Sequence, residues 1–222
     1  MPTMMTMLCE LEQRLQRTLP MARLEVVRVH DSPPLSLALI NADFPDERLP
    51  ADVMRAVIER PAYWAFCWGS GLGLARLMFE HPEWVRGQRV IDLGSGSGIA
   101  GIAAHLCGAR TVTACDIDDD ARVATVVNAE LNETRIDVVD TLDGCDADVL
   151  LMADVLYDTG NLPLLEAAAK HARVVLVADS RVKSLPTPTY RRVAEIDAAT
   201  FPNLGEFDEF LRVRMFRYES DR

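Results

Sequence analysis

The chain lacks long apolar runs and paired cysteines. None of the apolar stretches in its 222 residues reaches the roughly 20 residues that a bilayer-spanning helix needs, so we expect no membrane association. Residues 1–12 lack a basic start and include two glutamates, which argues against a signal or transit peptide. The five cysteines are scattered without a C-x-x-C pair, which favours free thiols in a reducing, cytoplasmic compartment and predicts no zinc or other metal centre.

Positive charge is also scarce. Lysine and arginine number 23 against 34 aspartates and glutamates, giving a formal net charge of −11. This balance disfavours a nucleic-acid partner and suits a partner with a basic patch, although solubility alone explains it equally well. Because no linker, internal repeat or low-complexity stretch divides the chain, we expect one domain over 1–222, with a monomer favoured. It would comprise an N-terminal extension with an aromatic loop (1–70) and a cofactor-binding and catalytic core (71–222).

Two apolar runs that each end in an acid are the most informative feature that is present. The first run ends in Asp92 and the second in Asp116. Three glycines at alternate positions, Gly94, Gly96 and Gly98, follow the first run. Glycine lets the backbone turn sharply after a strand and approach a ligand closely. An acid at the tip of the next strand is placed to accept hydrogen bonds from ribose hydroxyls. The pattern predicts the first half of a nucleotide-binding α/β sheet.

Apolar runs alternate regularly with helical patterns from residue 89 onwards. Strand-like runs cover 89–93, 110–116, 135–139, 147–153 and 173–179, and helical stretches cover 99–107, 118–131 and 161–171. Continuous apolar runs are typical of parallel strands covered on both faces, and the alternation predicts a doubly wound sheet. The tail departs from this pattern, because 190–198 and 209–218 both resemble strands and no helix fits between them. We expect these two to pair as an antiparallel hairpin.

The region before residue 89 has a different pattern. Leucines at helical spacing predict an amphipathic helix that ends near Pro20. After it we expect strands at 24–29 and 35–40, a helix at 52–59, a loop rich in aromatics at 61–71, and a helix at 72–80.

The glycine run fits two classes of cofactor site. Residues 96–101 also satisfy G-x-G-x-x-G, the dinucleotide fingerprint, but that match alone is weak. Asp92 would oppose a diphosphate at the helix N-terminus, whereas it would favour the positive amino group and sulfur of S-adenosylmethionine. The motif also follows a long N-terminal region, and the hairpin suits a methyltransferase. We therefore expect S-adenosylmethionine, with S-adenosylhomocysteine as product, rather than NAD. The predicted fold is α/β, a Rossmann-like seven-stranded methyltransferase sheet with a C-terminal antiparallel hairpin and an N-terminal helix/strand extension.

A carboxylate and a phenol follow the fourth strand of the predicted sheet. Asp154 and Tyr157 leave this strand at its carboxyl end, which is the edge where open α/β sheets bind ligands. Both side chains would then point toward the transferred methyl group. The alternative is that Asp154 only caps the following helix and that Tyr157 packs.

The segment Asp154–Tyr157 also carries a family resemblance. It matches the D-x-x-Y signature of the family 16 seven-β-strand methyltransferases, most of whose characterised members methylate protein lysines. The resemblance covers about 35–179, and within the family it is closest to the branch that methylates the β subunit of the electron-transfer flavoprotein. The residues that carry it are Pro61–Trp68, Trp84–Gly87, Asp92–Gly96, Asp116–Asp118, Ala153, Asp154, Tyr157 and Asp158. Asp179–Arg181 matches the closest relatives only in part.

This resemblance implies roles for the matching residues. Gly94, Ser95 and Gly96 would line the methionine end of the cofactor, together with Asp92. The ribose would be bound by Asp116, while Trp68 would pack near the cofactor and Ala153 would offer backbone beside it. For Trp64 and Trp68 the alternative to a role at the site is a hydrophobic lid or core contact.

The implied reaction is an in-line displacement at the sulfonium methyl by a neutral amine. Our hypothesis is that Asp154 captures and orients the amine, that a water removes its proton, and that Tyr157 holds it by a hydrogen bond or by its ring face. The substrate would be a protein, possibly the electron-transfer flavoprotein β subunit. A small-molecule N-methyltransferase and a non-catalytic binding module on the same fold are the alternatives.

Overall fold

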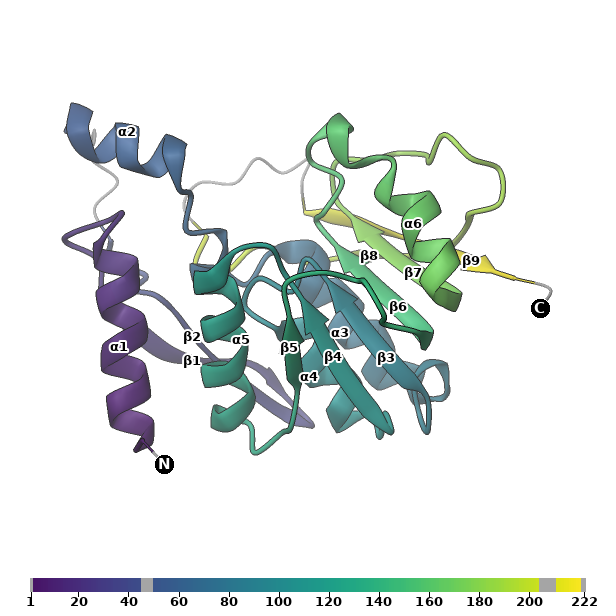
Figure 1. The fold of residues 1–222 in the computed structure, drawn as a ribbon, viewed down its shortest axis with the longest axis horizontal. Helices are drawn as coiled ribbons and strands as arrows, with labels where there is room; N and C mark the ends of the chain where they lie inside the picture. The colour runs from purple at the N-terminus through teal and green to yellow at the C-terminus, as the bar shows by residue number, and fades with distance from the viewer. Residues whose placement is uncertain (1, 45–49, 204–210, 221–222) are drawn as a thin grey trace.

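A central sheet of seven strands organises the described part of this computed structural model (Figure 1), which covers residues 2–44, 50–203 and 211–220. The strand order is β5-β4-β3-β6-β7-β9-β8, with the first five strands parallel and the last two antiparallel to their neighbours. The strands are β3 (Arg89–Leu93), β4 (Thr111–Cys115), β5 (Asp137–Val139), β6 (Ala147–Ala153), β7 (Ala172–Asp179), β8 (Arg191–Asp197) and β9 (Arg212–Glu219).

Helices and a small second sheet surround these strands. Strands β1 (Leu24–Asp31) and β2 (Pro34–Ile40) pair antiparallel, apart from the central sheet. The helices are α1 (Met4–Gln16), α2 (Ala51–Glu59), α3 (Gly69–Glu80), α4 (Ile99–Leu106), α5 (Asp119–Leu131) and α6 (Leu164–His171), with short 3₁₀ turns η1 (Tyr63–Ala65), η2 (Pro82–Trp84) and η3 (Thr159–Asn161).

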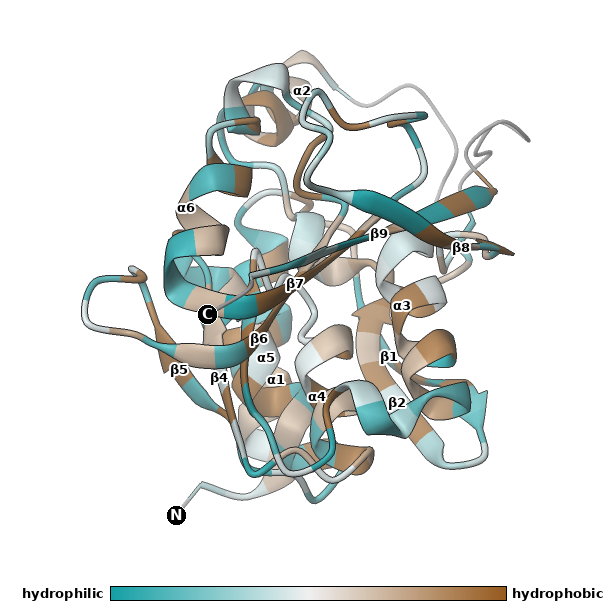
Figure 2. Cartoon of the chain, turned by 90° about the vertical axis from the view of Figure 1, so that its right-hand side faces the viewer, coloured by the Kyte–Doolittle hydropathy of each residue, from teal (hydrophilic) through white to brown (hydrophobic). Residues whose placement is uncertain are grey.

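The core lies on both faces of the central sheet. Along β6, Val149 and Leu151 belong to a cluster with α3 and α4, whereas Leu150 and Met152 belong to a second cluster with α6. Successive side chains of a strand point to opposite faces, so a strand that is buried on both faces must be apolar at every position. Figure 2 shows the brown, apolar strands β6 and β7 between α6 on one side and α3 and α4 on the other.

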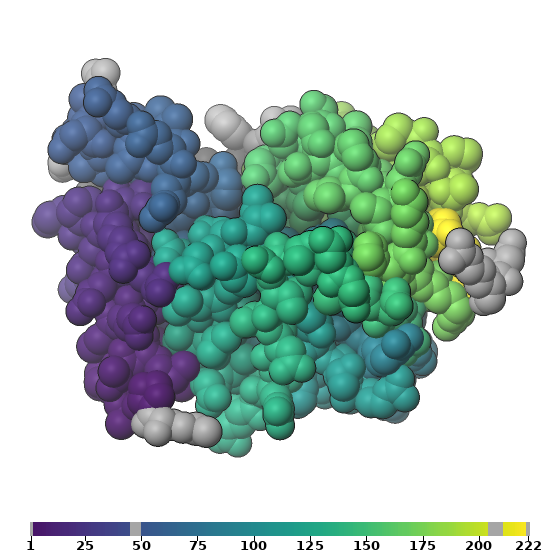
Figure 3. Space-filling view, viewed as in Figure 1, coloured from purple at the N-terminus to yellow at the C-terminus, as the bar shows by residue number. Residues whose placement is uncertain are grey.

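The N-terminal extension packs along α5. Leu11 and Leu15 of α1 join a third apolar cluster with α5 and β2, and the Arg14 guanidinium bonds to both Asp119 and Asp120 at the start of α5. Figure 3 shows α1, in purple, lying directly against the teal part of the core. Trp64 is buried in this same cluster, so the structure gives it the core contact and not a role at the site.

The predicted fold class and the C-terminal hairpin are confirmed, while several element ends differ from the expectation. Helix α1 ends at Gln16 instead of near Pro20, and β5 has three residues. Helix α3 begins at Gly69, inside the predicted loop. Gly69 packs so tightly that a β-carbon there would lie 2.5 Å from the Ala198 carbonyl oxygen. Residues 209 and 210 of the predicted last strand lie outside the described residues. Within the described ranges, no helix is long and apolar enough to cross a membrane.

Candidate functional site

The predicted site residues follow the carboxyl ends of three neighbouring strands. The residue that follows each strand still donates its N–H to a carbonyl oxygen of the adjacent strand, which holds all three ends at one edge of the sheet. These hydrogen bonds run from Gly94 to Cys115 (2.8 Å), from Asp116 to Val139 (3.1 Å) and from Asp154 to Ala178 (3.0 Å). Open α/β sheets bind their ligands at this edge.

The loop after β3 presents backbone instead of side chains. Gly94 has φ 71°, and a β-carbon there would lie 2.8 Å from a methyl of Val155, so only glycine fits. Gly96 also has a positive φ, of 52°, but a β-carbon there would meet nothing within 4 Å. The loop is tied to α5, because the buried Ser95 hydroxyl shares a 3.0 Å hydrogen bond with that of Thr125. An open backbone surface on a fixed loop is suited to a ligand that approaches closely.

Asp116 is fixed by backbone donors on two sides. The N–H of Gly96 donates to Asp116 Oδ2 at 2.9 Å, and the N–H of Asp118 donates to Oδ1 at 3.0 Å. Asp118 in turn caps α5, accepting a bond from the N–H of Asp120. Each carboxylate oxygen has a second lone pair, so Asp116 keeps acceptor capacity for the hydroxyls of a ligand.

Asp92 lies beneath α4. Its side chain is buried, with the residue 2% exposed, and it accepts the N–H of Gly101, in the first turn of α4, at 2.8 Å. Burial raises the pKa of Asp92 to about 7, and the hydrogen bond from Gly101 partly opposes this rise. A diphosphate at this helix would need the same free N–H groups and would meet this carboxyl group. The geometry therefore favours the predicted methyltransferase-type site over a dinucleotide site.

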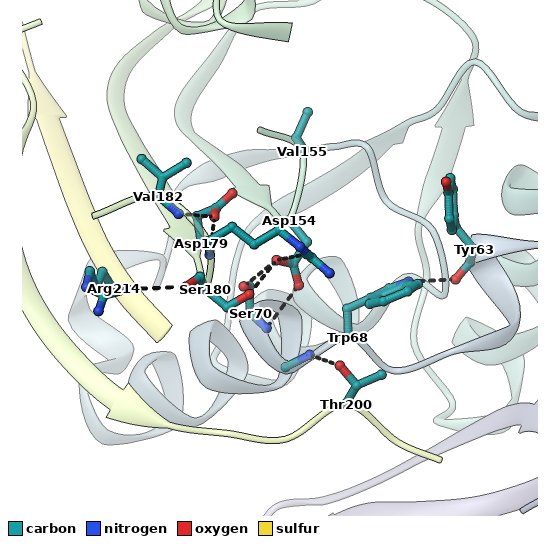
Figure 4. A network of polar contacts seen from close by, with 12 residues as sticks. Tyr63, Trp68, Ser70, Asp154, Val155, Asp179, Ser180, Val182, Thr200 and Arg214 are labelled. Carbon is teal, nitrogen blue, oxygen red and sulfur yellow. Dashed lines mark hydrogen bonds and ion pairs between the residues drawn. The ribbon is translucent and has the colours of Figure 1, made fainter. Parts of the chain in front are cut away.

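Asp154 is the centre of a polar network (Figure 4). Ser70, at the start of α3, donates its N–H to Asp154 Oδ2 at 3.1 Å and its hydroxyl to Oδ1 at 2.6 Å. The Ser180 hydroxyl lies 3.4 Å from the same Oδ1, and Nη1 of Arg181 lies 3.7 Å from it. Asp154 itself has φ 53°, a left-handed conformation that is uncommon for residues other than glycine and that often marks functional sites.

The Asp154 carboxyl group is nearly inaccessible to solvent. Its side chain is 9% exposed, and burial raises its pKa to about 6, helped by the nearby charge of Asp179. The hydrogen bonds from Ser70 and the charge of Arg181 act in the opposite direction. Asp154 is therefore ionised at neutral pH, and in that form it attracts cations.

Three aromatic rings form an exposed cluster from two distant segments. The Tyr63 ring lies 5.8 Å from that of Trp68 and 5.6 Å from that of Tyr157, both in edge-on arrangements. The Trp68 indole N–H donates to the Tyr63 carbonyl oxygen at 2.8 Å. Tyr157 is 52% exposed, so its ring is neither a core contact nor fully shielded from a partner.

The structure thus divides the predicted residues into two groups. The glycine loop and Asp116 are joined directly by a hydrogen bond, whereas Asp154 and Tyr157 both follow strand β6 but contact different partners. The half-buried Ala153 ends β6, paired with Ala178 of β7. The sequence interpretation assigned no role to four residues of this region, although all four stand within segments that it noted, 61–71 and 179–181: Tyr63, Ser70, Ser180 and Arg181.

Known proteins resemble the chain at this site. The sequence model of the ribosomal protein L11 methyltransferase family (PrmA) matches residues 79–160. The electron transfer flavoprotein beta subunit lysine methyltransferase of Danio rerio is 43% identical over 101 residues, which are 43% of this chain and 39% of that protein. The Xenopus laevis protein of the same name is 37% identical over 127 residues, 53% of this chain and 52% of that protein. The chain therefore matches about half or less of these relatives' length.

Solved structures agree on the fold. The T. thermophilus 16S rRNA N2 G1207 methyltransferase aligns with 90% of this chain and 50% of its own, at 15% identity and a TM-score of 0.56. A putative RNA methyltransferase from Pyrococcus horikoshii covers 68% of this chain and 82% of its own, at 17% identity and a TM-score of 0.52. The predicted resemblance is confirmed: residues 79–160 match a methyltransferase family, and the chain has the fold of S-adenosylmethionine-dependent methyltransferases.

Proposed function

We propose that the chain transfers a methyl group from S-adenosylmethionine to the side-chain nitrogen of a protein lysine. The electron-transfer flavoprotein β subunit is the first substrate to test, because the similar proteins of Danio rerio and Xenopus laevis are named for it. The observation that carries the proposal is the ionisable, buried Asp154 at the same sheet edge as an open glycine loop and an exposed aromatic cluster. A carboxylate beside aromatic rings recognises a cationic amine.

The residues present fit S-adenosylmethionine. Gly96 offers open backbone, and Asp116 keeps acceptor capacity beside it, which suits the methionine end and the ribose of the cofactor. Trp68, Ser95 and Ala153 are the further residues that we expect to line the bound cofactor. Asp92 contributes a negative charge from beneath the loop when its buried carboxyl group is ionised. When bound, the cofactor supplies an electrophilic methyl group on a sulfonium, and no metal or covalent enzyme intermediate is required.

The work of the protein is to bind the amine and to let it lose its proton. A free lysine, with a pKa near 10.4, is neutral in only about four molecules per ten thousand at pH 7. Asp154 attracts the ammonium form, and the aromatic rings of Tyr63 and Tyr157 shield its stem from water. The carboxylate of Asp154 raises the pKa of the amine, whereas desolvation and the positive charge of a bound sulfonium would lower it, so that a water could remove the proton before transfer. Tyr157 then holds the nitrogen with its hydroxyl or ring face.

The net charge and the free thiols support the proposed protein substrate and cytoplasmic location. A net charge of −11 suits a protein substrate that presents its lysine on a basic surface. Free cysteines, of which Cys67, Cys107 and Cys115 are buried, support the predicted cytoplasmic location. A single domain acting as a monomer remains our expectation for the organisation of the chain.

Transfer of labelled methyl groups tests the proposal. Purified chain, labelled S-adenosylmethionine and purified electron-transfer flavoprotein should yield label on the β subunit at a lysine found by mass spectrometry. Asp154→Ala serves as the loss-of-function variant, and Asp148→Asn, at the opposite end of the same strand, is the matched control. Label on neither this subunit nor other proteins, but on small amines, would make the chain a small-molecule N-methyltransferase. Failure to bind S-adenosylhomocysteine would instead indicate a binding module.

A further inference from the structure

A resident cation already lies beside the carboxylate of Asp154. Nη1 of Arg181 lies 3.7 Å from Asp154 Oδ1, and the guanidinium side chain is about one-third exposed. The other contacts of the carboxylate come from neutral groups, namely the N–H and hydroxyl of Ser70 and the hydroxyl of Ser180. Arg181 therefore supplies the positive charge at this carboxylate in the substrate-free protein.

The backbone that carries Arg181 is held in place. Asp179, at the end of β7, accepts the N–H groups of Arg181 and Val182 on one oxygen, each at 2.8 Å. Asp179 is 1% exposed, and Arg214 of β9 donates to the carbonyl oxygen of Ser180 at 3.2 Å. The loop is thus anchored to two strands, while the guanidinium end remains partly in solvent.

We propose that Arg181 is a positioning residue whose guanidinium occupies the amine's place beside Asp154 and keeps that carboxylate charged until a substrate lysine replaces it. The inference rests on the proposed function, because it takes a cationic amine as the substrate. A buried charge left without a partner is costly, so a resident cation stabilises the ionised form of Asp154 between turnovers. The pair is partly exposed and not in close contact, so its replacement by a substrate ammonium costs little.

Two opposite effects follow from removing the charge of Arg181. In Arg181→Gln the pKa of Asp154 rises, because the facing groups that remain, Asp179 and the Cys67 thiol, carry no positive charge. The acidic limb of the pH profile of kcat/KM then moves to higher pH. At pH 8.5, where Asp154 remains ionised, the substrate lysine no longer competes with a resident cation. The KM for the protein substrate then falls about threefold, with kcat unchanged within twofold.

The experiment compares Arg181→Gln with Arg181→Lys and with Arg89→Gln. Lysine keeps the charge and should restore wild-type behaviour, whereas Arg89 pairs with Asp148 at the opposite end of β3 and β6 and should leave both quantities unchanged. The readouts are KM and kcat against pH, and the pKa of Asp154 from carboxyl carbon NMR shifts, identified by their loss in Asp154→Asn. Thermal melting verifies that each variant is folded.

The outcomes separate this inference from the function on which it rests. A raised Asp154 pKa together with a lower KM at pH 8.5 in Arg181→Gln supports it. An unchanged Asp154 pKa, or a KM that is unchanged or higher, overturns it while wild-type methyl transfer to lysine leaves the proposed function intact. No methyl transfer to lysine by the wild-type protein overturns the proposed function, and the role of Arg181 toward an amine with it.

Discussion

Asp116 and Asp154 follow strands of the same sheet at the same edge, yet they are held in opposite ways. Asp116 accepts hydrogen bonds from the backbone N–H groups of Gly96 and Asp118. Asp154 is bound mainly by side chains from segments 84 and 26 positions away, Ser70 and Ser180, and by the ion pair with Arg181. The first arrangement is local and depends little on side-chain identity, whereas the second requires that three elements meet.

The two arrangements suit two tasks. A backbone-bound carboxylate has a fixed geometry and neutral donors, which is appropriate for a cofactor that is the same in every cycle. A carboxylate bound by buried hydroxyls and by a partly exposed arginine can exchange its cationic partner for another, as a variable substrate requires. If the comparison is right, substitutions at the two aspartates should affect different constants.

The largest effect is expected from Asp154→Asn. The substitution keeps the shape of the side chain but removes the charge that attracts and orients the amine, so kcat should fall about 100-fold or more. The Kd of S-adenosylmethionine, measured by calorimetry, should stay within twofold, because Asp154 belongs to the substrate side. Asp148→Asn at the beginning of β6 should leave kcat near the wild-type value. A loss of only a few-fold in Asp154→Asn would contradict the assigned role.

Asp116→Ala should show the reverse pattern. Hydrogen bonds to a charged group contribute about 1.5–3 kcal/mol, so the Kd of S-adenosylmethionine should rise about 10- to 100-fold. At saturating cofactor, kcat should remain within a few-fold of the wild type. Asp118→Asn is the matched control, because asparagine caps a helix as well as aspartate does. If Asp116→Ala left the affinity for the cofactor unchanged, Asp116 would not bind the ribose, and the division of tasks between Asp116 and Asp154 would be wrong.

The difference between the two aspartates also explains what the sequence could predict. Asp116 and the glycines form a local pattern, in which an apolar strand, a turn that needs positive φ and an acid on the next strand all leave a mark in the chain. The parallel sheet is predicted by continuous apolar runs that alternate with helical patterns. For this reason the sheet, the hairpin and the glycine loop were predictable.

The partners of Asp154 were not predictable, because they depend on tertiary contacts. Ser70 meets Asp154 from the first turn of α3, where Gly69 packs against the backbone of Ala198, far along the chain. Serine and glycine are weak helix formers, so local propensity predicted a loop there. Tyr63 was part of a noted aromatic run, but its contact with Tyr157 joins segments that only the folded sheet brings together.

Asp92 is a third carboxyl group of this region, and its raised pKa makes the stability of the protein depend on pH. Its folded pKa of about 7 lies above the unfolded value near 3.9, so between these values the folded state binds more protons than the unfolded state. Stability of the wild type therefore falls as pH rises from about 4 to 7. Asp92→Asn lacks this loss, so its free energy of unfolding relative to wild type should improve by on the order of 1–2 kcal/mol between pH 5 and 8.

Chemical denaturation at the two pH values measures this change, and Asp137→Asn, at an exposed position of β5, is the control. The same Asp92→Asn protein should bind S-adenosylmethionine less tightly, because the negative charge beneath the loop is lost. A stability difference that does not vary with pH would mean that Asp92 titrates in the normal range of an aspartate.

The smallest effect is expected from Tyr63, which links the two sides of the comparison through its contacts with Trp68 and Tyr157. Each ring contact of this kind contributes about 0.5–1.5 kcal/mol, so Tyr63→Ala should raise the KM for the protein substrate about 3- to 10-fold. Tyr63→Phe should behave as wild type, because the Trp68 indole bonds to the Tyr63 backbone carbonyl and not to its hydroxyl. If Tyr63→Ala changed the Kd of S-adenosylmethionine and left KM for the protein unaltered, the aromatic cluster would belong to the cofactor side, and Asp154 would be the sole described contact for the amine.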